Sequence, residues 1–198
     1  MMKAKNENGA LNRVQDDLKG NGYREKDVTI SSGKAMVLGV ACALPFVVIF
    51  GLSYRLVLIG RAHLLEIGGL SFYLLFAAII LVSVFLHELL HGVGWALASR
   101  RGWGVVGFNI SALMPSCACK AVLTRGQYLV GVLLPFLVLG TGSAVFLFLY
   151  PGTVSVLTMA VNFVAAGADL LIALRAARER GALIADHPTE AGYIAYFK

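Results

Sequence analysis

Two histidines and a glutamate lie at a spacing that suits metal-dependent hydrolysis. The segment Phe85–Gly92 contains His87, Glu88 and His91 in an HExxH pattern, inside a run of apolar residues. On an α-helix, His87 and His91 project from one face one turn apart, so both imidazoles can bind one zinc ion. Glu88 borders this face and is suited to deprotonate a water molecule beside the metal. The motif therefore predicts a Zn2+ site with Glu88 as the catalytic base.

A catalytic zinc ion usually has three protein ligands, so the two histidines need a third. Among the acidic residues, Glu88 and Asp169 are the two that lie within long apolar segments. An aspartate at the centre of a membrane costs on the order of 2.5 to 3.5 kcal/mol on insertion scales, which makes such a residue a functional candidate. Asp169 is therefore the predicted third metal ligand. An ion pair or a proton relay is the alternative role for Asp169.

The composition points to a helical membrane protein that carries these residues in its spans. The chain has 198 residues, of which 58% are hydrophobic and 14% are charged, whereas soluble domains have about 25% charged residues. Several apolar runs reach the ~20 residues that cross a bilayer as a helix, without the short alternating segments of a β-barrel. The predicted fold class is an all-α polytopic membrane protein. Its predicted partners are the lipid bilayer and a membrane protein or peptide substrate.

The basic residues predict how the helices are oriented. The formal net charge is +6, and its excess at the ends of apolar runs fits membrane topology rather than nucleic-acid binding. Both terminal segments and the loop at 101–127 are basic, whereas the turn Pro151-Gly152 is uncharged and the loop at 60–67 has Arg61 as its one lysine or arginine. Because cytoplasmic loops carry the basic excess, both termini are predicted to be cytoplasmic, in a multi-pass protein of the cell membrane.

Four transmembrane helices satisfy both the apolar runs and the charges. In this topology the second and fourth helices run in the same direction. The HExxH motif and Asp169 then lie roughly 16 and 9 Å from the inner boundary, a difference that helix tilt can absorb. The four helices are predicted at about residues 35–59, 68–98, 128–150 and 154–174.

The loop between the second and third helices contains an apolar stretch that predicts further structure at the membrane face. Beta-branched and aromatic residues precede the turn-type pair Pro115-Ser116. A short β-hairpin or a re-entrant segment is therefore predicted, and a loop that merely lies on lipid is the alternative. Cys117 and Cys119 in this loop either offer thiolate ligands or redox chemistry, or are ordinary reduced thiols.

The motif in the second helix, together with Asn162 and Asp169 in the fourth, resembles the site-2 protease class of intramembrane zinc metalloproteases. It resembles in particular the small bacterial four-span proteins classed as putative zincin peptidases. The resemblance implies that His87, His91 and Asp169 bind zinc. The prolines of the family's aspartate motif are absent here, and Leu170 stands where that motif has glycine.

The resemblance also suggests where a substrate binds. Such proteases present an extended edge to the substrate, which must lose its helix before hydrolysis. The segment Val105–Ile110 would add a strand to the substrate in this way, with Val106 and Phe108 as substrate-binding residues. Asn162 would orient a metal ligand or a substrate amide.

The predicted function is a membrane-embedded zinc metalloendopeptidase that hydrolyses peptide bonds at or within the bilayer. One alternative is a non-catalytic metal-binding membrane protein, such as a chaperone or regulatory subunit. Another is an ion transporter, which the lack of an internal repeat disfavours. The predicted domains are a cytoplasmic N-terminal segment (1–34), a four-helix membrane metalloprotease-like domain (35–180) and a cytoplasmic C-terminal tail (181–198).

Overall fold

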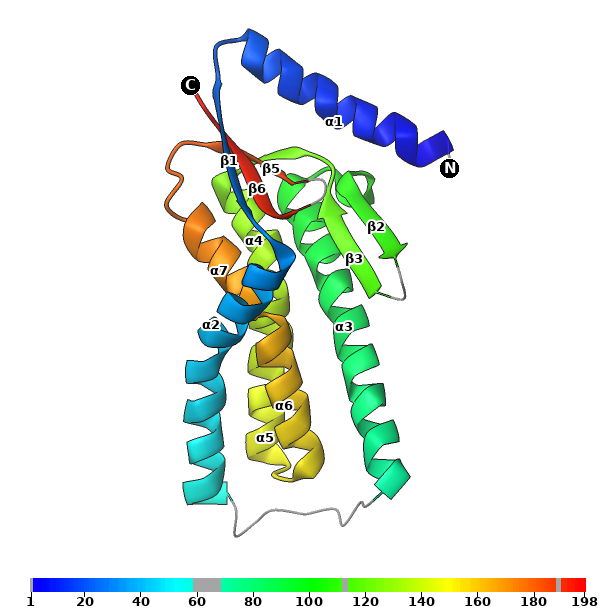
Figure 1. The fold of residues 1–198 in the computed structure, drawn as a ribbon, viewed down its shortest axis with the longest axis vertical. Helices are drawn as coiled ribbons and strands as arrows, with labels where there is room; N and C mark the ends of the chain where they lie inside the picture. Colours follow the sequence, from blue (N-terminus) through cyan, green and yellow to red (C-terminus); the bar gives the residue numbers. More distant parts are fainter. Residues whose placement is uncertain (1, 59–68, 112–113, 188–189) are drawn as a thin grey trace.

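Four apolar helical segments run side by side along the long axis of the computed structural model (Figure 1). The structure describes residues 2–58, 69–111, 114–187 and 190–198, so the predicted loop at 60–67 lies outside the described residues. Within the described part, four segments are long and apolar enough to cross a membrane, as predicted. These segments are Gly33–Leu56, Gly69–Ser99, Arg125–Leu149 and Thr153–Ala176.

Most of these segments are interrupted, and the interruptions have local causes. A π-helical turn, Phe136–Gly140, follows Pro135, whose ring nitrogen cannot donate a backbone hydrogen bond. The helices are α1 (Met2–Gly20), α2 (Ser32–Ser53, continued by a π turn at Tyr54–Leu58), α3 (Gly69–Ser99), α4 (Arg125–Pro135), α5 (Thr141–Leu149), α6 (Thr153–Ala165) and α7 (Gly167–Ala176). The strands are β1 (Arg24–Ile30), β2 (Val106–Ser111), β3 (Met114–Cys119), β4 (Val122–Thr124), β5 (Leu183–Asp186) and β6 (Ala191–Phe197).

The chain is mostly helical, and its strands go beyond the short hairpin that the sequence predicts. Strands β2 and β3 form an antiparallel hairpin between α3 and α4, so the hairpin alternative for this loop is the one observed. A second antiparallel sheet, with the order β1-β6-β5-β4, was not predicted. Its strand β1 comes from the N-terminal segment and pairs with β6 from the C-terminal tail along its whole length. The two tails thus form one layer at the end of the bundle where both termini lie (Figure 1).

The sheet of the two tails covers a packed core at this end of the bundle. Ile184, Tyr193 and Ala195 are fully buried. They belong to one cluster with Trp95 of α3 and Tyr128 of α4. This sheet is therefore joined to the helices by buried side chains rather than by a flexible tether.

The outward faces of the helices are apolar. Leu70, Leu81 and Leu97 of α3 are 73%, 69% and 72% exposed. Such extended apolar surface is unusual on a soluble monomer. The pattern is compatible with a multi-pass membrane protein.

Glycines bring the site-bearing helices into backbone contact. A Cβ atom added at Gly94 of α3 would lie 2.7 Å from the Cα of Gly131 in α4. A Cβ atom added at Gly39 of α2 would lie 2.7 Å from the backbone nitrogen of Ala168 in α7. No side chain larger than hydrogen fits at either crossing, and small residues permit this close approach in membrane bundles.

Candidate metal centre

Helix α3 carries the two histidines of the motif on its buried face. His87 and His91 are 7% and 6% exposed. Their side chains lie one helical turn apart, and the two Nε2 atoms are 3.1 Å from each other. The helix is continuous from Gly69 to Ser99, so the motif has the regular i, i+4 geometry expected from the sequence.

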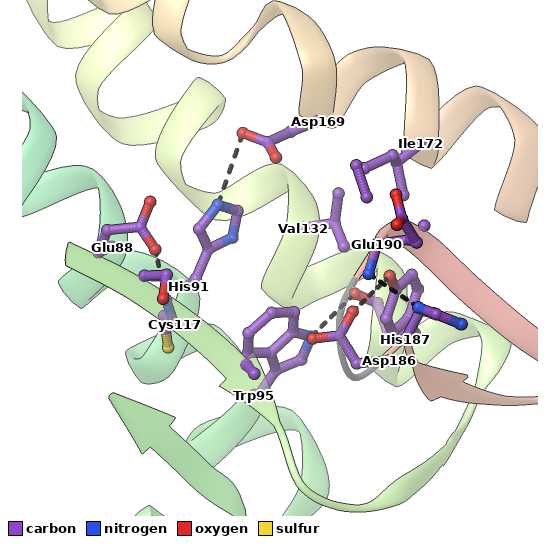
Figure 2. Close-up of a pocket in the computed structure, with 15 residues that line it drawn as sticks. Glu88, His91, Trp95, Cys117, Val132, Asp169, Ile172, Asp186, His187 and Glu190 are labelled. Carbon is purple, nitrogen blue, oxygen red and sulfur yellow. Dashed lines mark hydrogen bonds and ion pairs between the residues drawn. The ribbon is translucent and has the colours of Figure 1, made fainter. Parts of the chain in front are cut away.

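Asp169 approaches the histidines from the first turn of α7. Its Oδ2 atom lies 2.9 Å from Nε2 of His87 and 3.5 Å from Nε2 of His91. Figure 2 shows the carboxylate reaching from α7 toward the ring of His91. The helix breaks at Ala166, so α6 and α7 are separate elements rather than the one helix that the sequence predicts.

The protonation of these groups tests whether they fit a metal ion. Nδ1 of His91 lies 2.9 Å from the carbonyl oxygen of Gly131, and it must donate there because a carbonyl only accepts. In the neutral ring, Nε2 of His91 therefore carries a lone pair directed at the other two groups. The Oδ2 atom of Asp169 is buried and has no hydrogen bond of acceptable geometry, although Nε2 of His87 is near it. Lone pairs of His91 and Asp169 thus converge where a cation would be stabilised.

The size of this group fits zinc. The three ligand atoms of His87, His91 and Asp169 form a triangle with sides of 2.9, 3.1 and 3.5 Å. Around a tetrahedral zinc with its usual bond lengths, two neighbouring ligand atoms are roughly 3.3 Å apart. Among the described residues, these three form the group of metal-ligating side chains close enough to share one ion. The donor set, two imidazoles and one carboxylate, is also one that zinc accepts.

Glu88 lies beside this group and is held by the β2–β3 hairpin. Its Oε2 atom accepts a hydrogen bond of 2.6 Å from the backbone amide of Cys117 in β3. This bond leaves Oε1 without a bond to β3. The sequence correctly places Glu88 next to the histidines, but it does not reveal the contact with β3.

Two cavities meet at Glu88. One is polar, has a volume of about 330 Å³ and also borders His91 and Asp169. The other has a volume of about 230 Å³ and is almost wholly apolar. Besides Glu88, the second cavity is lined by Phe85, Leu89, Phe108, Asn109 and Pro115.

The other predicted site residues are less closely associated with the metal group. Phe108 lines the apolar cavity with Glu88. The side chain of Val106 packs against Gly92 of α3, so a Cβ atom added at Gly92 would meet it. The amide nitrogen of Asn162 donates to the carbonyl of Thr158 within its own helix. In the described part of the chain, no hydrogen bond joins Asn162 to the metal group, so its orienting role stays a prediction.

The two thiols of β3 have the properties of reduced cysteines. Burial, followed by the nearby Glu88 carboxylate, raises the pKa of Cys117 to about 12. Burial likewise raises the pKa of Cys119 to about 12. Among the described residues, neither thiol belongs to the group of side chains close enough to share one ion. This favours the reduced-thiol alternative over metal ligation.

A second layer of residues supports the histidines, and the sequence did not predict it. The indole of Trp95 stacks on His91 with ring centroids 5.4 Å apart. Its Nε1 donates to the carbonyl of Tyr128, and the hydroxyl of Tyr128 donates to Oδ1 of Asp186 at 3.1 Å. Burial raises the pKa of Asp186 to about 6. The signal available in the sequence was one carboxylate, Asp186, at the end of the apolar stretch Leu183–Asp186.

A known family covers the elements that build this centre. A family model described as "Putative zincin peptidase" matches residues 80–181, just over half of the 198 residues. The chain belongs to this family. No curated protein and no solved structure matches the chain. Family membership agrees with the predicted metallopeptidase class and implies zinc, for which the group of His87, His91 and Asp169 offers the ligands.

Proposed function

We propose that this zincin-family protein is a membrane-embedded metalloendopeptidase of the site-2 protease type, which hydrolyses peptide bonds at or within the bilayer. One observation carries the proposal. The ligand atoms of His87, His91 and Asp169 converge within 3.5 Å, and Glu88 lines the cavity that His91 and Asp169 border.

The position of the site along the helices supports hydrolysis inside the membrane. At a rise of 1.5 Å per residue, His91 lies about 12 Å before the end of α3 at Ser99. Asp169 lies about 10 Å before the end of the fourth segment at Ala176. Because the bilayer core is about 30 Å thick, both ligands would lie within it, in the half next to the termini. With the basic excess on that side, we place the termini in the cytoplasm.

The metal ligands and Glu88 have different roles in the proposed reaction. A zinc ion held by the three ligands would supply Lewis acidity toward a peptide carbonyl and water. Glu88 takes a proton from the attacking water while the water oxygen bonds to the carbonyl carbon. When the C–N bond breaks, Glu88 gives this proton to the leaving amine and returns to its ionised form. The amide of Cys117 holds one oxygen of Glu88, which leaves the other oxygen for the proton.

The two cavities supply separate routes to Glu88. The apolar cavity suits a hydrophobic peptide that arrives from the lipid side. The polar cavity suits water, because several carboxylates and imidazoles line it. Hydrolysis in a membrane needs both reactants at one carboxylate, and this arrangement supports that requirement.

Zinc content and cleavage test the proposal together. The purified full chain should contain one zinc ion per molecule by elemental analysis and should cleave casein, a generic unfolded substrate. Glu88→Gln should keep the zinc and abolish cleavage, whereas Asp169→Ala should lose the zinc. Asp17→Ala, an exposed acidic position on α1, is the control and should change neither.

The alternatives give other results. Cleavage that survives Glu88→Gln would exclude Glu88 as the base. Zinc retained in Asp169→Ala would exclude Asp169 as a ligand. A zinc-loaded protein without cleavage of casein, and with no membrane protein that accumulates in cells carrying Glu88→Gln, would favour the non-catalytic metal-binding protein.

A further inference from the structure

Strand β3 has one paired edge and one edge that faces the polar cavity. Just beyond the register of β2 and β3, the amide of Lys120 donates to the carbonyl of Val105 at 2.7 Å. Alternate amides of an antiparallel strand point to the same side. The amide of Lys120 points toward β2, so the amides of Cys117 and Cys119 point away from β2. This outward edge of β3 borders the polar cavity.

Carboxylates occupy both outward amides. Cys117 donates to Oε2 of Glu88 at 2.6 Å, and Cys119 donates to Oδ2 of Asp186 at 3.0 Å. Residues two apart on a strand are about 6.6 Å apart, which is the spacing at which a neighbouring strand would present its carbonyls. Hydrogen bonds to ionised acceptors are stronger than neutral ones. Glu88 and Asp186 thus hold the same strand at adjacent outward positions.

Asp186 is itself fixed by the residues that support the metal group. Its second oxygen, Oδ1, accepts from the hydroxyl of Tyr128 at 3.1 Å. Tyr128 is 1% exposed and stacks on Trp95, which stacks in turn on His91. Figure 2 shows Asp186 and Glu88 on opposite sides of the same cavity, with the Trp95 ring near Asp186. Each oxygen of Asp186 therefore has a partner on a different element of the site.

We propose that Asp186 is a positioning residue of the active site: it holds β3 through the Cys119 amide, so that the Cys117 amide two residues earlier orients Glu88. This inference rests on the proposed function, because it needs Glu88 as the base. It assigns a role to the hairpin of β5 and β6, which lies beyond residues 80–181 matched by the family model. The C-terminal tail is then part of the working site rather than an appendage.

Amide exchange reports this restraint without any need for a substrate. Hydrogen–deuterium exchange is measured by mass spectrometry on the zinc-loaded full chain, in peptides that contain Cys117 and Cys119. Asp186→Ala removes both acceptor oxygens, and exchange in these peptides should become about tenfold faster, as expected for the loss of one hydrogen bond to a charged group. Asp17→Ala is the control, because Asp17 is an exposed acidic position on α1 that does not line the cavity.

The kinetics distinguish positioning from general destabilisation. For casein, Asp186→Ala should lower kcat at least tenfold with a smaller change in KM, while one zinc per chain is retained. Asp186→Asn keeps one acceptor oxygen and should give intermediate exchange and intermediate kcat. If Asp186→Ala does not fold, Asp186→Asn decides by the same two measurements.

The outcomes separate this inference from the proposed function. Wild-type exchange and wild-type kcat in the Asp186 variants would overturn the inference, and so would equal acceleration of exchange in Asp17→Ala. A loss of zinc in Asp186→Ala would overturn it as well, because the role would then lie in the metal group. If the wild-type protein does not cleave casein, the proposed function fails, and the exchange rates still decide whether Asp186 holds β3.

Discussion

The contact between Gly39 of α2 and the backbone of α7 sets the position of Asp169, and one added methyl group tests it. A Cβ atom at Gly39 would lie 2.7 Å from the backbone nitrogen of Ala168. Ordinary contacts begin near 3.4 Å, so Gly39→Ala must move α7 away by about 0.7 Å. Asp169 directly follows Ala168 and moves with it, whereas the histidines stay on α3.

The displacement is large compared with what a zinc site tolerates. Zinc–ligand distances in working sites hold within about 0.2 Å. Rotation of the Asp169 side chain can absorb part of a 0.7 Å shift but not all of it. We therefore expect the zinc affinity of Gly39→Ala to fall 10- to 100-fold, on the order of the loss seen when groups that orient ligands are changed. This corresponds to roughly 1.4 to 2.8 kcal/mol of binding free energy.

The assay is a competition titration of the zinc-free protein in detergent against a chromophoric zinc chelator. Gly51→Ala is the matched control, because Gly51 lies on the same helix and a Cβ atom there meets nothing within 4 Å. Wild type and Gly51→Ala should bind zinc equally, and Gly39→Ala more weakly. Equal affinity of all three proteins would refute the claim that this helix crossing positions Asp169.

Three further predictions concern the hairpin and the C-terminal tail. Phe108→Pro removes an outward amide of β2 and leaves the pairing with β3, so cleavage of casein should fall without loss of zinc if substrates add to β2; unchanged cleavage argues against that edge. Cys117→Ser and Cys119→Ala should keep one zinc per chain by elemental analysis, and loss of zinc would identify a thiolate ligand. Burial raises the pKa of Asp186 from 3.8 to about 6, so the folded chain holds this proton more tightly than the unfolded chain does. The stability contributed by Asp186 is present below pH 4 and is lost as the pH rises through 6, by at most about 3 kcal/mol. The thermal midpoint of the zinc-free protein should accordingly fall more between pH 5 and 7 in wild type than in Asp186→Asn, and equal slopes would contradict this.

The helices and the centre of the motif could be predicted because their signals are local. An apolar run of span length needs no information from the rest of the chain. The spacing of His87 and His91 likewise defines one face of a helix without knowledge of the fold. Asp169 was found by a different signal, the cost of a carboxylate in an apolar segment, and the structure brings it to the histidines within 3.5 Å.

The sheet of the two tails could not be predicted because its information is not local. Strand β1 pairs with β6 over residues more than 160 positions apart in the sequence. The first residues of β1, Arg24–Asp27, are exposed, so this stretch has the composition of a solvated segment rather than of a strand. Strand β1 is stable as part of the four-stranded sheet, since an isolated pair of strands is only marginally stable.

The hairpin shows how far a composition signal extends. Beta-branched and aromatic residues around Pro115 predicted a hairpin, and β2 and β3 form one. The composition drew attention to the apolar strand with Val106 and Phe108. The strand whose amide holds Glu88 is instead β3, with the small residues Cys117, Ala118 and Cys119. Which strand lies beside Glu88 depends on three-dimensional packing, and Val106 and Phe108 of β2 meet α3 at Gly92 instead.

The sheet of the two tails links the candidate site to segments outside the family match. The proposed zinc ligands lie on α3 and α7 within the matched region, and helix contacts inside the bundle hold them, including the contact of α7 with Gly39 of α2 outside that region. The proposed base, Glu88, has a different support. It accepts a hydrogen bond from β3, and β3 donates to Asp186. Asp186 lies on β5, which pairs with β6, and β6 pairs with β1. Changes in the terminal segments should therefore affect the orientation of Glu88, and hence kcat, before they affect zinc binding. We therefore expect the helices to carry the proposed metal ligands and the sheet built from both ends of the chain to hold Glu88 beside them.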